Sequence, residues 1–107
     1  NGNLRLIKAV VPNLNPNDLR SLAAQVNKRA APSIVLLVSE SNGKCGMVCI
    51  CSEEAVEAGH QAGKYLGELA EKLGGKGGGK PDFAMGGAHA GKDLNEALNG
   101  ISFTTEG

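Results

Sequence analysis

The run Ser33–Ser39 constrains the fold of this 107-residue chain most, because every residue between its two serines is apolar. A short apolar run that is rich in β-branched residues predicts a strand buried on both faces. Other elements must therefore cover both faces of the sheet. The Asn-Gly pair in Ser41–Lys44 predicts a tight hairpin turn. The next run, Cys45–Cys51, is then expected to return antiparallel to the first.

Helical periodicity flanks this hairpin on both sides. Asn15 is typical of a helix cap and Pro16 of a first helical position. Apolar residues then recur at helical spacing up to Ala30, and Ala31-Pro32 ends this helix. We expect one domain over residues 1–107, an α/β (α+β) fold with a small mixed sheet and helices on both faces, in the order β-α-β-β-α-loop-α with or without a final strand. The predicted elements are a strand at Leu4–Val11, a helix from Asn15 to Ala30, strands at Ser33–Ser39 and Cys45–Cys51, a helix that Ser52–Ala58 leads into and that runs to Leu73, a helix at about Lys92–Asn99 and the optional strand Ile101–Thr104.

Charge and composition narrow the classes of function. Eleven Lys and Arg residues balance eleven Asp and Glu residues, which argues against a strongly basic nucleic-acid binder but leaves room for a local basic patch. No apolar run approaches the ~20 residues that cross a bilayer, so no membrane partner is expected. The chain begins with Asn1 and shows no leader pattern, which predicts a piece of a longer, unsecreted protein.

The residues that usually carry catalysis form no recognisable constellation. Cys45, Cys49 and Cys51 lack the spacing of a zinc site, and we expect three buried, reduced thiols in a reducing compartment, the cytoplasm or an organellar matrix. His60 is expected to be solvated or to cap a helix, and His89 receives no role. Glu53, Glu54 and Glu57 are better explained as a solvated helix N-terminus than as a metal site, and no metal is predicted.

The most informative segment is the glycine-rich stretch Gly74–Gly91, which holds eight of the sixteen glycines. We interpret it as a loop whose backbone N–H groups form a nest for an anion, with Lys76 and Lys80 supplying positive charge. The alternative of a flexible surface loop stays open. A P-loop is disfavoured, because Pro81 follows Lys80 where a Ser or Thr would hold Mg²⁺.

The motif Gly74-Gly75-Lys76-Gly77-Gly78-Gly79-Lys80-Pro81-Asp82-x-Ala84-x-Gly86-Gly87 resembles the glycine-rich signature of the DHH-associated domain at the C-terminus of alanyl-tRNA synthetases. The resemblance extends at lower specificity over about Leu14–Leu98. It implies a non-catalytic domain at the C-terminal end of a longer, ATP-dependent alanine–tRNA ligase. The aminoacylation chemistry, with its ATP and zinc, would lie in the missing parts of the parent enzyme, and no cofactor is expected in this chain.

The resemblance also implies partners and site residues. In that family the domain contacts the outer corner of tRNA(Ala), the elbow, and helps couple aminoacylation with editing by other domains of the same synthetase. Carried over to this chain, the predicted RNA-binding residues are Lys76, Gly77, Gly78, Gly79, Lys80 and, more weakly, Lys92. Scarce aromatic residues favour recognition of RNA shape and backbone over base stacking.

Two alternatives remain at this stage. The chain would serve as a dimerisation or interaction module if Cys45–Cys51 lay at an open sheet edge. It would otherwise be the equivalent domain of a free-standing alanyl-tRNA editing protein or a DHH-type phosphoesterase. The phosphoesterases carry His directly after their glycine run, where this chain has Lys80, and that difference favours the synthetase branch.

Overall fold

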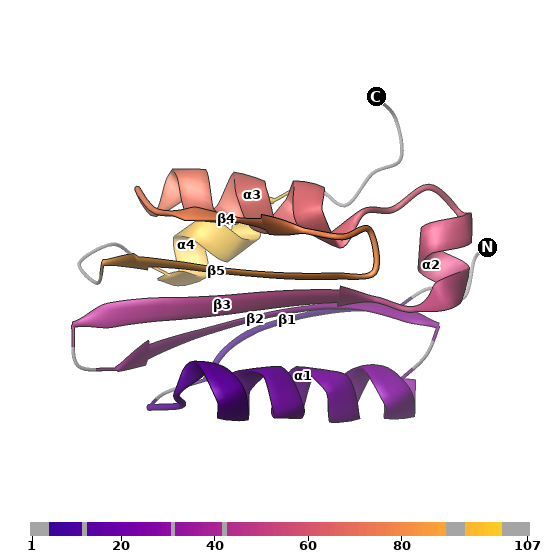
Figure 1. The fold of residues 1–107 in the computed structure, drawn as a ribbon, viewed down its shortest axis with the longest axis horizontal. Coiled ribbons are helices and arrows are strands. Elements are labelled where there is room, and N and C mark those ends of the chain that lie inside the picture. Colours follow the sequence, from indigo (N-terminus) through magenta and orange to yellow (C-terminus); the bar gives the residue numbers. More distant parts are fainter. Residues whose placement is uncertain (1–4, 12, 31, 42, 90–93, 102–107) are drawn as a thin grey trace.

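A five-stranded mixed sheet, in the order β1-β2-β3-β5-β4, forms the centre of the molecule, with helices on both faces (Figure 1). The computed structural model describes residues 5–11, 13–30, 32–41, 43–89 and 94–101. Within these ranges, no helix is long and apolar enough to cross a membrane. The elements are β1 (Arg5–Val10), α1 (Pro16–Ala30), β2 (Ser33–Ser41), β3 (Lys44–Cys51), α2 (Glu53–Glu57), α3 (Ala62–Lys72), β4 (Lys76–Gly79), β5 (Phe83–His89) and α4 (Leu94–Asn99).

The N-terminal half follows the sequence prediction closely. Asn15 caps α1, and its side-chain oxygen accepts a hydrogen bond of 2.8 Å from the N–H of Asp18. β2 is buried over residues 33–39, and β3 pairs with it in antiparallel register through a turn in which Gly43 has a φ of 78°. β1 pairs with β2 in parallel, so α1 is the crossover between them. The mixed sheet with helices on both faces is thereby confirmed.

Each face of the sheet has its own apolar core. Alternate residues of β2 and β3 point to opposite faces, which divides their side chains between the two cores. The core under α1 contains Leu19, Ala23, Val35, Leu37, Val48 and Ile50. The core under α3 and α4 includes Ile34, Leu36, Val38, the three cysteines, Met47, Tyr65, Leu66, Leu69 and Leu98.

Two expectations about the second half were wrong, and the condition attached to the dimerisation alternative is not met. The predicted loop over the glycine run is instead the hairpin β4–β5. The stretch leading from Ser52 into the second helix is a separate short helix, α2, because Gly59 turns the chain with a φ of 104° before α3 begins. β3 lies in the middle of the sheet, so Cys45–Cys51 is not an open edge for dimerisation. The optional strand Ile101–Thr104 falls almost wholly outside the described residues; Ile101 itself is buried and is not in a strand.

His60 is buried rather than solvated. Its exposed fraction is 9%, and its Nδ1 lies 2.6 Å from the hydroxyl oxygen of Tyr65, which is fully buried at the start of α3. Burial raises the pKa of Tyr65 to about 12, so the hydroxyl stays protonated and can donate to a neutral imidazole. Burial lowers the pKa of His60 below its ordinary value of 6.5. The pair therefore favours the uncharged ring.

We expect the domain to lose stability as the pH falls below about 6.5. The unfolded chain takes up a proton on His60 near that pH, whereas the folded chain resists protonation until a lower pH, so acid favours unfolding. Urea unfolding at pH 7.5 and pH 5.5 measures this loss. A His60→Gln variant should show a smaller difference between the two conditions. An equal difference in both proteins would assign the acid sensitivity to other groups.

Candidate nucleic-acid interface

The glycine run forms the edge of the sheet. β4 pairs antiparallel with β5, and β5 pairs antiparallel with β3. Ala84 is buried in the core under α3, and the half-buried Phe83 and Met85 pack against the core under α1. These side chains anchor β5, and pairing with β5 satisfies those backbone groups of β4 that point toward it. Of the run Gly74–Gly79, only Gly74 and Gly78 have positive φ, and Gly78, at 156°, is nearly extended.

The close approach of α3 explains part of this glycine pattern. A Cβ on Gly77 would overlap the Leu66 side chain, and one on Gly86 would lie 2.7 Å from Leu66 Cδ1 and from the Gly77 Cα. On the helix side, a Cβ on Gly63 would lie 2.8 Å from the carbonyl oxygen of Gly79. Real Cβ atoms do not approach other atoms so closely. α3 therefore packs closely on the hairpin, and this packing accounts for Gly77 and Gly86 on the strands and for Gly63 on the helix.

Hydrogen bonds fasten the hairpin to both ends of α3. At the helix start, the N–H groups of Ala62 and Gly63 donate to the carbonyls of Pro81 and Lys80, at 2.7 and 3.2 Å. At the helix end, Gly74 adopts a φ of 75°, and the Gly75 N–H donates to the Ala70 carbonyl at 2.7 Å. This is a Schellman-type cap, and its left-handed residue explains a glycine at position 74.

The predicted RNA-binding residues therefore do not surround one concave loop. Lys76 begins β4 and Lys80 follows its end, so about 13 Å of extended chain separates them. Both side chains are exposed. Gly77, Gly78 and Gly79 lie between them in the edge strand, and Lys92 lies outside the described residues.

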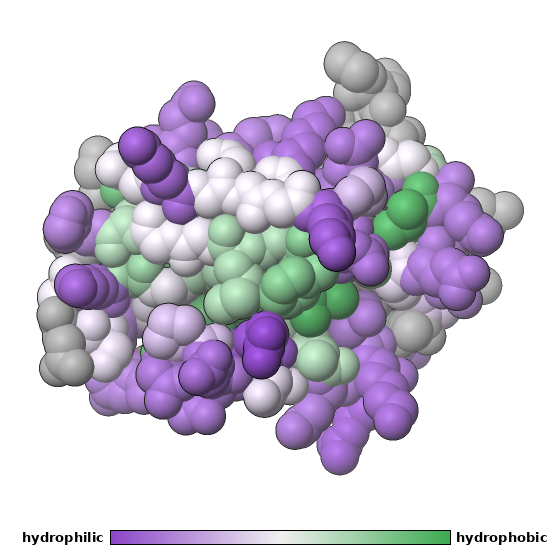
Figure 2. Space-filling view, viewed as in Figure 1, coloured by the Kyte–Doolittle hydropathy of each residue, from purple (hydrophilic) through white to green (hydrophobic). Residues whose placement is uncertain are grey.

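A groove lies on the opposite face of the hairpin, where α1 leaves the sheet uncovered. It has a volume of about 860 Å³ and runs between the start of α1 and the adjoining ends of β3, β4 and β5. In the space-filling view, pale and green residues form a band across this side of the molecule, with hydrophilic side chains around it (Figure 2). The band is pale because glycine supplies much of the surface of β4 and β5.

Strand register places the groove residues in two rows across the sheet. Gly46 pairs with Gly87, and Gly87 pairs with Lys76, so these three residues share one face. In the neighbouring row, Lys44 pairs with His89. Gly46 and Gly87 leave the floor bare, while Lys44, Lys76 and His89 are exposed around it.

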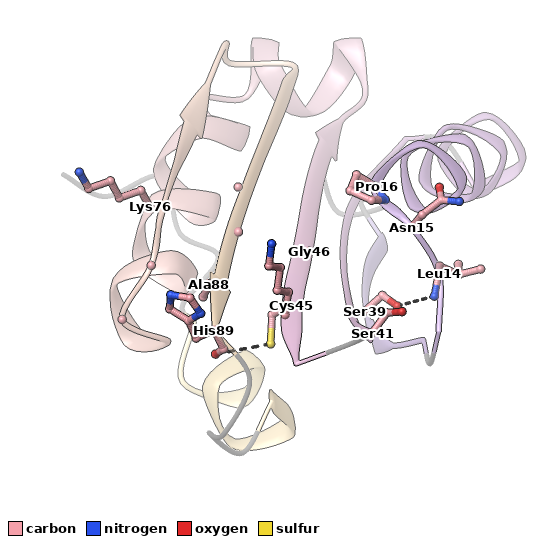
Figure 3. Close-up of a pocket in the computed structure, with 15 residues that line it drawn as sticks. Leu14, Asn15, Pro16, Ser39, Ser41, Cys45, Gly46, Lys76, Ala88 and His89 are labelled. Atoms are coloured by element: carbon pink, nitrogen blue, oxygen red, sulfur yellow. Dashed lines mark hydrogen bonds between the residues drawn. The ribbon is translucent and has the colours of Figure 1, made fainter.

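The walls of the groove are held in place by backbone and side-chain contacts (Figure 3). On the α1 side, the Leu14 N–H donates to Ser39 Oγ at 2.8 Å, which ties the entry of the helix to the end of β2. On the β5 side, the His89 carbonyl lies 3.9 Å from Cys45 Sγ. Lys76 extends outward from the edge strand β4, and its ammonium group points away from the other labelled groove residues (Figure 3). The positive end of the α1 dipole adds to the charge of the lysines.

The groove has the electrostatic character of an anion-binding surface. Two lysines line it, and no carboxylate is found among the described residues of its lining. Glu40, in β2, pairs with the buried Cys45 and so faces the other side of the sheet. In a chain of zero net charge, this is a local excess of positive charge.

The three cysteines pack in the core under α3 and α4. All three are free and buried on the α3 side, as predicted. A hydrogen bond with Cys51 together with burial raises the pKa of the Cys49 thiol, and burial raises that of Cys45. Over the described ranges, no three His, Cys, Asp or Glu side chains are grouped so that they could hold a metal ion.

Sequence reasoning overlooked Lys44, Gly46 and His89 as site residues. One signal was present, because a glycine inside an otherwise apolar strand often marks a place where another backbone comes close. Gly46 interrupts Cys45–Cys51 in that way. The pairing of Lys44 with His89 had no sequence signal, since β5 was not predicted.

Residues 3–103 match the DHHA1 domain family. The chain belongs to this family. The DHHA1 domain is 49% identical over 95 residues to an alanine–tRNA ligase of Opitutus terrae and 40% identical over 98 residues to one of Rhodopirellula baltica, which covers 89% and 91% of this chain. The chain spans only 10% of the length of each of these two relatives.

A solved structure shows the same fold. The C-Ala domain from Aquifex aeolicus alanyl-tRNA synthetase is 30% identical to this DHHA1 domain, with a TM-score of 0.78 over 88% of this chain and 84% of that one. The resemblance drawn from the glycine-rich motif is confirmed. The DHHA1 domain groups with the C-terminal domains of alanyl-tRNA synthetases.

Proposed function

We propose that this DHHA1 domain is a non-catalytic tRNA-binding domain at the C-terminal end of a cytoplasmic or organellar alanine–tRNA ligase. It contacts the elbow of tRNA(Ala) and helps couple aminoacylation with editing by other domains of the same enzyme. The observation that supports this proposal most is a lysine-bearing face without lining carboxylates, in a domain whose relatives are alanine–tRNA ligases.

The composition of this face suits RNA backbone better than bases. Lys44, Lys76 and Lys80 are exposed on or beside the β4–β5 hairpin. Phe83, the only aromatic residue of this hairpin, is half-buried and packs against the core under α1. Phosphate contacts by lysine orient a protein on RNA without reading sequence, and they weaken steeply with salt.

Binding of this chain to full-length tRNA(Ala) at two salt concentrations tests the proposal, with an acceptor-stem hairpin as the second RNA. We expect binding to the full tRNA, weaker binding to the hairpin and a loss of affinity at higher salt. The double variant Lys76→Ala/Lys80→Ala should bind at least tenfold more weakly, and its salt dependence should fall by a slope of about 1 to 2.

A variant with the same loss of charge elsewhere provides the control. Lys28 and Arg29 lie exposed in the last turn of α1, away from the hairpin, and Lys28→Ala/Arg29→Ala should bind like the wild type. Equal weakening by both double variants would indicate a diffuse charge effect. A folded wild-type chain that bound neither RNA would contradict the tRNA-binding function.

A further inference from the structure

The glycines within strands β3, β4 and β5 do not all share one physical reason. Those facing α3 are required by packing, because a Cβ on Gly77, Gly79 or Gly86 would lie within 3.0 Å of backbone or a buried side chain. Gly46 faces the groove instead, and a Cβ there would meet only Leu19 Cδ2, at an ordinary 3.9 Å. A Cβ on Gly78 would meet nothing within 4 Å. Packing does not explain a glycine at position 46.

Gly46 also lies where a glycine is unfavourable for the strand itself. Glycine in a strand interior costs conformational entropy and packs no side chain. Its φ is not among the positive values, so the backbone does not require it either. A glycine that neither packing nor backbone geometry requires is consistent with a bare surface that another molecule approaches.

From these observations we infer that the groove is a binding site for the sugar–phosphate backbone of RNA. The Gly46 and Gly87 floor admits the backbone in close contact with the sheet, while Lys44 on β3 and Lys76 on the edge strand β4 contact its phosphates. His89, opposite Lys44 in the strand register, is a further donor to the same strand of RNA. Lys80, at the far end of β4, is not among the groove's lining residues. This inference rests on the proposed tRNA binding and assigns it to particular residues.

Two substitutions test the groove directly in titrations of this chain with full-length tRNA(Ala). Gly46→Ala fills the floor with a methyl group that the fold has room for, so it should weaken binding about fivefold without lowering the free energy of unfolding. Lys44→Ala should weaken binding about tenfold and reduce the salt slope by about 1.

Each substitution has a matched control on the other face of the sheet. Gly67→Ala adds the same methyl group in α3, where the nearest atom, the Gly77 carbonyl oxygen, is 3.9 Å away. Lys64→Ala removes one exposed charge from α3. Both controls should bind tRNA like the wild type.

The outcomes separate this inference from the function it rests on. Weakening by the groove variants but not by their controls supports the groove as the RNA site. Wild-type affinity in both groove variants, with the wild type itself binding tRNA, overturns the groove and leaves the tRNA-binding function standing. Failure of the wild type to bind overturns both.

Discussion

Gly86→Ala is expected to lower the free energy of unfolding by about 3 kcal/mol, at the upper end of the usual cost of overpacking. The new methyl group would lie 2.7 Å from the Gly77 Cα, from Leu66 Cδ1 and from the Lys76 carbonyl oxygen. Two of these atoms are backbone, so relief requires β4 to move away from β5. Urea unfolding followed by circular dichroism measures the loss.

Gly46→Ala is the matched control for this result, because it makes the same change one strand away without a clash. Its free energy of unfolding should stay level or rise slightly, since alanine restricts the unfolded chain more than glycine does. A loss of similar size in both variants would show that any side chain on these strands is harmful, and that the approach of α3 is not the reason.

Leu66→Ala is expected to cost about 3 kcal/mol, because a fully buried leucine leaves a cavity between α3 and the hairpin. The same substitution should make room for a methyl group at position 77, whose Cβ would otherwise overlap the Leu66 side chain. Gly77→Ala should therefore cost less in the Leu66→Ala background than in the wild type, with a coupling of about 1 kcal/mol or more. Urea unfolding of the two single variants and the double variant completes the cycle.

The milder Leu66→Val keeps this cycle measurable if the alanine variant fails to fold. Gly46→Ala, on the other face of the sheet, should be additive with either substitution. Additivity of Gly77→Ala with Leu66→Ala would contradict direct packing of Leu66 on β4.

The sequence predicted those elements whose side chains carry a pattern. Ser33–Ser39 and the Asn-Gly turn fixed the central hairpin, and Asn15 marked the start of α1. Hairpin β4–β5 was missed because period-2 alternation needs side chains, and glycine supplies none. The choice between a loop and a strand at Lys76–Gly79 depended on α3 lying against it, which is a tertiary contact.

The same limit applied to the site. The glycine and lysine pattern directed the site prediction to β4 and β5, and strand pairing places the bare, lysine-flanked surface on the face away from α3. His60 was misread because its burial depends on Tyr65, five positions later in a separate helix. Neither the strand pairing nor the contact between His60 and Tyr65 can be predicted from the local periodicity of the sequence.

The hydrogen bonds at the two ends of α3 require the helix and the extended chain of β4 beside it to be about equally long. Eleven helical residues rise about 16 Å, and the five steps from Gly75 to Lys80 extend about 17 Å. One residue inserted into either α3 or β4 would lengthen that element alone, and the hydrogen bonds at one end of the helix would then be out of register. The residue type can therefore vary at the exposed positions of the glycine-rich strand β4, whereas the length of this strand is fixed by the helix α3 beside it.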